Sequence, residues 1–177
     1  MGRMFSSLTL PVAVPARTGS LTLAAARPED LEVLMALLAD DAVSAARGDV
    51  AAEGDKERYA AALEAIQADP SNVLLLARDE SGVVVATMQL TVIPGMARRG
   101  STRLMVEAVR VSSARRSAGI GEAMMRWVMG PAAVATGASL VQLTSDAARV
   151  DAHRFYERLG FVGSHVGFKY AVPGGAA

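Results

Sequence analysis

The sequence contains no cysteine among its 177 residues. This absence excludes disulfides, thiolate-ligated metal sites and a cysteine nucleophile. Histidine is scarce as well: only two occur, and no cluster of carboxylates accompanies them, so we expect no bound metal. A reducing compartment is compatible with this composition, and we expect a cytoplasmic protein.

An excess of charge of either sign is also missing. Lysine and arginine together number 18, and aspartate and glutamate together number 18, so the formal net charge is zero. Strong affinity for nucleic acid depends on a basic field that neutralises phosphates. We therefore expect no nucleic-acid partner, and any anion-binding site must be local.

Long apolar runs are absent from the sequence. A membrane-spanning helix needs about 18 to 20 consecutive apolar residues. Gln89, Thr91 and Pro94 interrupt the longest candidate stretch. We therefore expect a soluble protein with no membrane partner.

Length and composition favour one folded domain, because 51% hydrophobic and 20% charged residues over 177 positions can build a single core. The first twenty residues differ from the rest. They lack acidic residues and a helical period, and they contain Pro11 and Pro15. We therefore predict a flexible leader over residues 1–20 and a single domain over residues 21–177.

Two helices are expected early in the chain, the first entered at Pro28 and the second stopped before Pro70. Each has one apolar face at helical spacing. The two helices and the loop between them could form the roof of a site. The apolar faces consist of Leu31, Leu34, Met35 and Leu38 on the first helix and of Tyr59, Leu63 and Ile66 on the second.

The other elements alternate between strand and helix. The order indicates a mixed α/β sheet whose middle unit crosses from one strand through a helix to a parallel neighbour. Gly130 and Pro131 should kink or end that helix. The expected elements are a strand at 21–25, a hairpin at 72–93, a strand at 104–111, a helix from about Gly121, a strand at 139–145, a helix at 150–161 and a last strand at 168–172.

The segment Val109–Trp127 contains an apolar strand end, two arginines and a glycine-rich turn that leads into a helix. Free backbone N–H groups at a helix N-terminus bind anions, and glycine lets a phosphate approach them. The segment is not a P-loop, because Gly121 is followed by Glu122 instead of a Lys-Ser/Thr pair. It is not the Rossmann fingerprint either, because Met124 occupies the position of the third glycine.

What fits is Arg116-x-x-Gly119-x-Gly121, preceded by the strand "AVRV" and followed about 35 residues later by "RFYERLGF". In this order, the segment Leu104–Phe161 resembles the coenzyme A half of the GNAT N-acetyltransferase superfamily. The strand–helix–helix start matches the family's first half. The resemblance implies a mixed, mostly antiparallel central sheet of six to seven strands with a splayed parallel pair, flanked by about four helices.

The resemblance also implies acetyl-CoA as co-substrate and no metal. Backbone amides of the glycine-rich turn would hold its pyrophosphate, and a strand segment would pair with its pantetheine arm. An ordinary strand-to-helix turn and a solvated arginine remain the alternatives. One departure is Ser117, near which the family usually carries glycine. The implied pyrophosphate contacts are Arg116, Ser117, Ala118, Gly119, Ile120 and Gly121, and the implied pantetheine contacts are Val109, Arg110 and Val111.

Two side chains are candidates for proton transfer. Glu107 is the only acid in "LMVEAVRV", and the resemblance implies a base on this strand. The alternative is a structural partner for Arg110 or for a basic residue of the neighbouring loop. Strict alternation places Glu107 and Arg110 on opposite faces unless the strand has a bulge. Tyr156 occupies the position from which the family protonates the leaving thiolate. Its alternative role is to pack within an apolar helical stripe.

The resemblance thus predicts an N-acetyltransferase that moves the acetyl group of acetyl-CoA to a primary amine by direct attack. A non-catalytic acyl-CoA-binding sensor is the alternative. The acceptor, a small-molecule amine or an exposed amino group, should be bound by the helix pair and the loops 43–54 and 94–103. Asp40, Asp41 and Asp49 could attract a cationic amine, and Arg98, Arg99 and Arg103 could bind an acceptor with a carboxylate. Solvated loop charges explain both sets equally well. The oligomeric state stays open, with a homodimer as one option.

Overall fold

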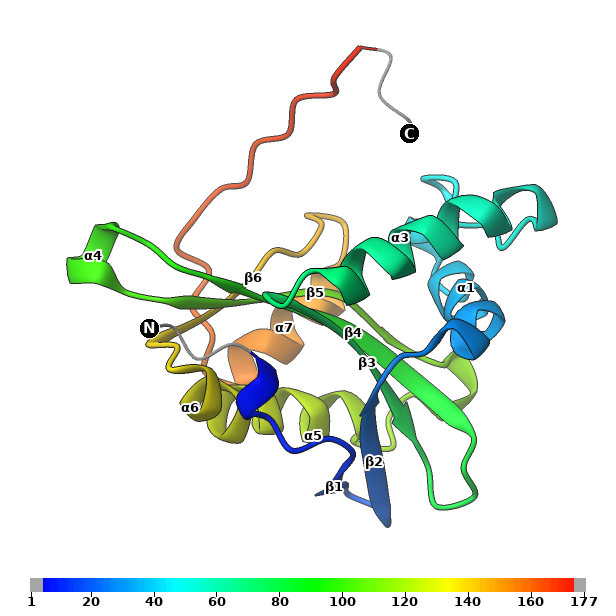
Figure 1. Cartoon of the computed structure of the whole chain (residues 1–177), viewed down its shortest axis with the longest axis horizontal. Helices are drawn as coiled ribbons and strands as arrows, with labels where there is room; N and C mark the ends of the chain where they lie inside the picture. The colour runs from blue at the N-terminus through cyan, green and yellow to red at the C-terminus, as the bar shows by residue number, and fades with distance from the viewer. Residues whose placement is uncertain (1–4, 174–177) are drawn as a thin grey trace. The chain divides into compact units, whose positions relative to one another are not determined.

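The structure is a computed structural model that describes residues 5–173. The central element of the fold is a β-sheet (Figure 1). Within these residues the sheet has six strands in the order β1-β2-β3-β4-β5-β6. The pairs from β1 to β5 are antiparallel. β6 is parallel to β5, and the two strands start together where the Ser139 N–H donates to the Thr102 carbonyl at 3.0 Å. The strands are β1 Val12–Pro15, β2 Ser20–Ala25, β3 Asn72–Arg78, β4 Val84–Ile93, β5 Arg103–Val111 and β6 Leu140–Leu143. The predicted mixed sheet with one parallel pair is confirmed.

Seven α-helices occur within the described residues. Within residues 5–173, four helices have eight residues or more, which matches the expected number, and three further helices have four residues each. None of the helices in this range is long and apolar enough to cross a membrane. The helices are α1 Leu31–Ala39, α2 Ala42–Ala45, α3 Lys56–Ala68, α4 Ala97–Gly100, α5 Ile120–Trp127, α6 Ala133–Thr136 and α7 Val150–Arg158.

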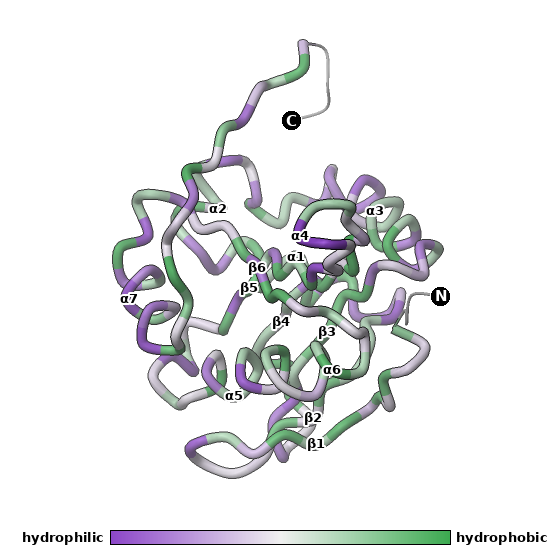
Figure 2. The backbone as a smooth tube through the Cα atoms, turned by 90° about the vertical axis from the view of Figure 1, so that its left-hand side faces the viewer, coloured by the Kyte–Doolittle hydropathy of each residue, from purple (hydrophilic) through white to green (hydrophobic). Residues whose placement is uncertain are grey.

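The core lies on both faces of the sheet. α1 and α3 cover one face, where Leu34 and Leu63 pack against Leu76 (Figure 1). α5 covers the other face and buries Met124 and Met125 completely. Figure 2 shows the hydrophobic colouring concentrated in the strands between these helices. Burial of the apolar faces is therefore what holds the helices to the sheet.

The chain divides into two compact units at the end of β6, between Gln142 and Leu143. The first unit contains β1 to β5 and α1 to α6. The second contains α7 and the residues that follow it. The sequence predicts a last strand at residues 168–172, but residues 161–172 contain no regular secondary structure. Alternating apolar side chains such as Phe168, which is 93% exposed, favour a strand only where an edge supplies hydrogen-bond partners.

The segment predicted as a leader contains regular structure. Residues 12–15 form β1, which pairs with β2, and Val14 of this strand is buried. Pro15 ends β1 at the outside of the sheet, where a missing backbone N–H costs no ladder hydrogen bond. Composition alone did not indicate this strand, because the strand is defined by its pairing with β2 and not by its own residues. Residues 1–4 lie outside the described part of the chain.

The helix after the glycine-rich turn ends early, as Gly130 and Pro131 predict. α5 stops at Trp127, and a single π-helical turn over Val128–Ala132 follows before α6 begins. Proline has no N–H to donate within a helix, so the backbone changes its hydrogen-bond pattern around Pro131.

Candidate active site

β5 carries a β-bulge in its second half. Gln89 lies opposite Glu107, and Thr87 lies opposite Arg110, so one residue more is used on β5 than on β4 between these pairs. The extra residue is accommodated at Ala108, whose φ of 49° lies in the left-handed region. A bulge of this kind re-aims the side chains that follow it.

The bulge brings Glu107 and Arg110 to the same face of the sheet. Side chains of opposed residues in an antiparallel pair share a face, and so do residues two apart on one strand. Gln89 and Thr87 are two apart on β4, so their partners Glu107 and Arg110 also share that face. This is the face that α1 and α3 cover.

Glu107 and Arg110 nevertheless make different contacts. The Arg110 guanidinium donates to the Val109 carbonyl at 2.8 Å and to the hydroxyl of Ser44, which is 2% exposed. The side chain of Glu107 is exposed, and within residues 5–173 its carboxylate makes no ion pair or hydrogen bond. The alternative role of Glu107 as the structural partner of Arg110 has no contact to support it in this structure.

The glycine-rich turn forms a loop over residues 112–121, here called the β5–α5 loop. Its first part is a short 3₁₀ turn at Ser113–Arg115, and α5 begins with Gly119 as its N-cap. The first helical hydrogen bond runs from the Ala123 N–H to the Gly119 carbonyl. Ile120, Gly121 and the following residue therefore present backbone N–H groups at the positive end of the helix dipole.

Two residues of this loop have positive φ angles. Gly119 has φ 80°, and Ser117 has φ 67°. Ser117 lies near the position where the family usually carries glycine. Its backbone has a conformation that glycine adopts without strain. A Cβ atom at Gly119 would also lie 2.7 Å from the Cβ of Arg17. Glycine is therefore required at position 119 by contacts within the chain itself.

The β5–α5 loop is joined to the end of α1 through Asp40. The Ser113 N–H donates to the Asp40 carboxylate at 2.6 Å, and the Arg116 guanidinium donates to the Asp40 carbonyl at 3.0 Å. The hydrogen bonds from Ser113, with a smaller contribution from the charge of Arg116, hold the pKa of the Asp40 carboxyl below its usual value. Arg116 thus lies at the loop and contacts α1.

The connection between α1 and α3 is held by hydrogen bonds of its own. The Asp41 carboxylate accepts the Ser44 N–H at 2.8 Å and caps α2. The Tyr59 hydroxyl donates to Asp49 at 2.6 Å, and this bond is the main reason that the pKa of Tyr59 rises to about 12. All three acids proposed from the sequence to attract the acceptor are therefore engaged in contacts within the chain.

The three arginines proposed for the same role lie elsewhere. Arg98 and Arg99 belong to the exposed turn α4, at the far end of the β4–β5 pair from α1 (Figure 1). Arg103 donates to the side chain of Gln142 at 3.2 Å. The structure therefore does not bring these arginines together with the bulge.

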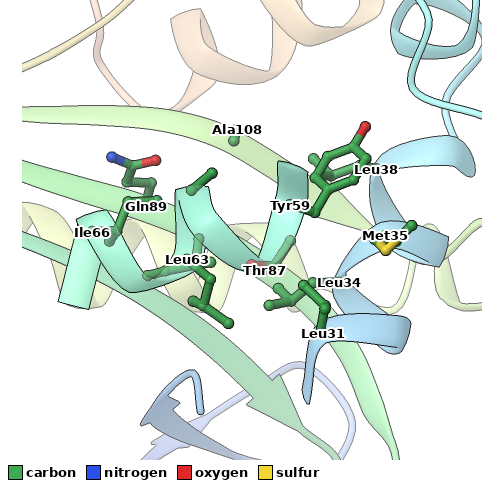
Figure 3. A pocket seen from close by; sticks show the side chains of 12 residues that line it. Leu31, Leu34, Met35, Leu38, Tyr59, Leu63, Ile66, Thr87, Gln89 and Ala108 are labelled. Carbon is green, nitrogen blue, oxygen red and sulfur yellow. The ribbon is translucent and has the colours of Figure 1, made fainter. Parts of the chain in front are cut away.

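A cavity of about 200 Å³ lies between the helix pair and the sheet. Figure 3 shows side chains from α1 and α3 facing the strands that carry Thr87, Gln89 and Ala108. The two apolar helix faces predicted from the sequence supply most of this wall. The lining residues are Leu31, Leu34, Met35 and Leu38 from α1, Tyr59, Ala62, Leu63 and Ile66 from α3, and Leu74, Thr87, Gln89 and Ala108 from the strands.

Sequence reasoning did not find this cavity, although it found most of its walls. A helical stripe indicates which residues face the sheet, but it does not indicate how closely they pack. The cavity exists because the side chains of α1 and α3 leave space above the β5 bulge. The only signal in the sequence was the pair of apolar faces, which indicate the residues that line the cavity but not the space between them.

Tyr156 lies on α7 in the second unit, whereas Glu107 and the β5–α5 loop lie in the first. Its half-buried ring makes edge contacts with Phe155 and Phe161, at centroid distances of 5.2 Å and 5.8 Å. One turn earlier, His153 Nε2 is 2.9 Å from the Asp146 carbonyl. The apolar packing foreseen for Tyr156 is thus present, and its role in proton transfer stays a prediction.

No group of three or more His, Cys, Asp or Glu residues that could hold a metal ion occurs in the part of the chain from residue 5 to residue 173. Of the charged side chains near the bulge, Arg110 makes the hydrogen bonds described above, whereas Glu107 is exposed. The site is therefore made of one exposed carboxylate, an apolar cavity and a loop that presents backbone N–H groups.

In this mixed sheet, one strand leads through a glycine-rich loop and a helix to a parallel neighbouring strand. This arrangement is typical of α/β proteins of the acetyltransferase type. A sequence model of the Acetyltransferase (GNAT) family matches residues 34–161. The chain belongs to this family, and the resemblance recognised in the sequence is confirmed. Members of the family normally use acetyl-CoA as co-substrate. Among curated proteins, none matches the sequence.

Solved structures give the same fold. A transcriptional regulator from Bacillus halodurans C-125 is 36% identical, with a TM-score of 0.80, and the match covers 86% of this chain and 99% of that one. An acetyltransferase from Trypanosoma brucei is 22% identical, with a TM-score of 0.68 and coverage of 86% and 99%. Glucosamine-6-phosphate N-acetyltransferase from Arabidopsis thaliana is 18% identical, with a TM-score of 0.66 and coverage of 85% and 97%. The last two similarities concern the fold alone.

Proposed function

We propose that the protein is an acetyl-CoA-dependent N-acetyltransferase that acts on a primary amine. The observation that carries the proposal is the bulge at Ala108, which leaves the Glu107 carboxylate exposed on the cavity face without a partner within the described residues. A carboxylate that is free to accept a proton, beside a cavity large enough for a small molecule, is what an acceptor site of this family requires.

The β5–α5 loop is the proposed site for the pyrophosphate of acetyl-CoA. Its positive φ angles at Ser117 and Gly119 turn the backbone so that N–H groups gather at the start of α5. The proposed pyrophosphate contacts also include the other residues of this loop, which are Arg116, Ala118, Ile120 and Gly121. The charge of Arg116 favours an anion, and its bond to Asp40 holds the loop against α1.

The end of β5 is the proposed site for the pantetheine arm. β6 has four residues and starts beside Thr102, whereas β5 has nine residues, so Val109, Arg110 and Val111 extend beyond the end of β6. Backbone groups of a strand in this position can pair with an extended ligand as an added strand would.

In the proposed reaction, the neutral amine attacks the thioester carbonyl, a C–N bond forms and the C–S bond breaks. A lysine-like amine with a pKa of about 10.4 is only about one part in a thousand neutral near pH 7.4, which costs about 4 kcal/mol. Glu107 accepts the proton that the amine loses, directly or through a water molecule. The Val109 N–H polarises the carbonyl oxygen, and Tyr156 donates a proton to the departing thiolate.

The test is release of free thiol from acetyl-CoA in the presence of a panel of amines, amino acids, polyamines, aminoglycosides and peptides. Glu107→Gln should lower turnover by about 10²- to 10⁴-fold, the range that a positioned general base contributes. Glu64→Gln, an exposed glutamate on α3 that does not line the cavity, is the matched control and should keep wild-type turnover. Full activity of the folded Glu107→Gln variant would remove Glu107 from the mechanism.

A second function is favoured by one comparison. The Bacillus halodurans protein that is 36% identical is a transcriptional regulator, so an acyl-CoA-binding sensor without turnover is the competing proposal. The net charge of zero gives the chain no basic field of its own for DNA. Saturable binding of acetyl-CoA without thiol release for any amine of the panel would favour the sensor.

A further inference from the structure

The cavity between α1, α3 and β5 has an apolar wall. Among residues 5–173, the twelve that line it include none with a charged side chain. Each polar side chain that lines it donates a hydrogen bond within the chain. Thr87 donates to the Leu75 carbonyl at 2.8 Å, Gln89 donates to Asn72 at 3.0 Å, and Tyr59 donates to Asp49 at 2.6 Å.

This wall discriminates against a polar occupant. A hydroxyl or ammonium group that enters this cavity loses its water and meets no charged side chain among the lining residues, which costs free energy. An apolar group gains free energy in the same place because its surface leaves water. A polyamine or an amino sugar is therefore a poor match for the cavity, and an alkyl or aryl group is a good one.

The volume sets the size of that group. Protein interiors are close-packed, and voids much larger than a water molecule are few. A dry apolar cavity of about 150 Å³ is known to hold a benzene molecule. The cavity of about 200 Å³ in this protein can therefore hold one aromatic ring with a short linker, or an alkyl chain of similar volume.

The position of the cavity connects it to the proposed reaction. Ala108 lines the cavity and directly follows Glu107 in the bulge, and Gln89, which also lines it, is the cross-strand partner of Glu107. An apolar group held in the cavity would thus leave an attached amine on the face where the carboxylate lies. The residues of β4 that line the cavity and the proposed base thus share one face of the sheet.

We propose that the acceptor is a primary amine whose apolar body, about one aromatic ring or an equivalent alkyl group in size, is bound in the cavity between α1 and α3. This inference rests on the proposed N-acetyltransferase function and specifies its substrate class. Two sources supply the same chemistry, a free arylalkyl or alkyl amine and the N-terminal residue of a peptide with an apolar side chain.

The experiment measures kcat/KM for a series of amines that share one ammonium group and differ in apolar size, from ethylamine through hexylamine to 2-phenylethylamine. We expect an increase of about threefold to fourfold for each methylene added until the cavity is full, because burial of one methylene is worth about 0.8 kcal/mol. Spermidine and glucosamine, which are polar, should be at least about tenfold poorer than 2-phenylethylamine. A peptide that begins with phenylalanine, assayed beside 2-phenylethylamine, distinguishes the two sources.

Two variants test the cavity itself. Ala62 lines it from an exposed position on α3, so Ala62→Phe should fill the space and lower kcat/KM for 2-phenylethylamine by about tenfold or more while sparing ethylamine. Ala61→Phe, at the neighbouring exposed position that does not line the cavity, is the matched control. Ile66→Ala should enlarge the cavity and move the optimum to a longer chain. Thermal unfolding of each variant verifies that it is folded.

The outcomes separate the two proposals. If polar amines are acetylated as well as apolar ones and Ala62→Phe changes nothing, the inference is wrong while the N-acetyltransferase function stands. If no amine is acetylated, the proposed function fails. Calorimetric titration with 2-phenylethylamine then still tests whether the cavity binds an apolar amine. Binding that Ala62→Phe abolishes and Ala61→Phe preserves would support an apolar amine site, and absence of binding would overturn it.

Discussion

The Asp40 carboxylate accepts the backbone N–H of Ser113 at 2.6 Å, across 73 positions of sequence. This bond joins the end of α1, which borders the acceptor side, to the β5–α5 loop proposed to hold the co-substrate. The Arg116 guanidinium strengthens the connection through the Asp40 carbonyl. Asp40 thus links the two halves of the proposed site.

Removal of this link should be visible as a pH-dependent loss of stability. The pKa of Asp40 is lowered in the folded protein, so its carboxylate stabilises the fold above the unfolded pKa of about 3.9, and this contribution disappears as the pH falls through the lower folded pKa. We expect Asp40→Asn to lower the melting temperature at pH 6, and the difference from wild type to shrink below about pH 4.

The control for this measurement is Asp151→Asn. Asp151 has a side chain that is 99% exposed and only a long contact to Arg154, so its substitution should leave the melting temperature nearly unchanged at every pH. A difference between wild type and Asp40→Asn that stays constant from pH 6 to pH 3 would contradict the role given to the ionised carboxylate.

Ser117 should carry backbone strain that glycine would relieve. Its φ of 67° costs an L-residue about 1–2 kcal/mol, and a β-branched side chain suffers most. We therefore expect Ser117→Val to be less stable than Ser117→Gly by about 1–2 kcal/mol in urea unfolding. The control is Ala114→Val in the same exposed loop. Because Ala114 does not have a positive φ angle, this substitution should change stability by less than about 0.5 kcal/mol.

The requirement for glycine at position 119 should depend on Arg17. Gly119→Ala places a Cβ atom 2.7 Å from that of Arg17 and also strains a φ of 80°, so we expect a loss of about 2 kcal/mol of stability. In an Arg17→Gly background the clash with the Arg17 Cβ is removed, whereas the backbone strain and a 3.3 Å contact with the backbone nitrogen of residue 17 remain. The double-mutant cycle should therefore show a coupling of about 1 kcal/mol, and additive effects would show that the collision relaxes without cost.

Tyr59 should resist ionisation. Its hydrogen bond to Asp49 raises its pKa to about 12, so the stability that this bond contributes is present below the unfolded pKa of about 10 and is lost as the pH rises from about 10 to about 12. In a spectroscopic titration, Tyr59→Phe should remove the component near pH 12. The same variant should cost about 1 kcal/mol at neutral pH. Loss of a component near pH 10 instead would show that the bond does not persist in solution.

Tyr156→Phe separates proton donation from packing. The substitution keeps the ring contacts with Phe155 and Phe161 and removes only the hydroxyl. If Tyr156 protonates the thiolate, kcat should fall by about 10²-fold with little change in KM and melting temperature. A variant with unchanged kcat would leave Tyr156 with its packing role alone.

The sequence by itself determined the elements that depend on local pattern. Residues 31–38 and 59–66 carry a helical period, residues 72–93 have the β-rich composition of a hairpin, and the glycine-rich turn starts a helix because its residues permit the backbone to turn there. These features rest on neighbours within a few positions. They were sufficient to recognise the GNAT family, the mixed sheet and the β5–α5 loop.

Only the tertiary structure decided the features that join distant segments. The bulge at Ala108 depends on the register of β5 against β4. The strand β1 depends on its pairing with the edge of β2, which the composition of residues 1–20 does not predict. The last predicted strand at residues 168–172 is absent because alternation supplies no partner. The acids Asp40, Asp41 and Asp49, which could have attracted a cationic amine or been solvated loop charges, are used within the chain. The apolar cavity near Glu107 is formed where two helix faces meet the sheet. Packing and register across the fold set these properties, and no local pattern contains them.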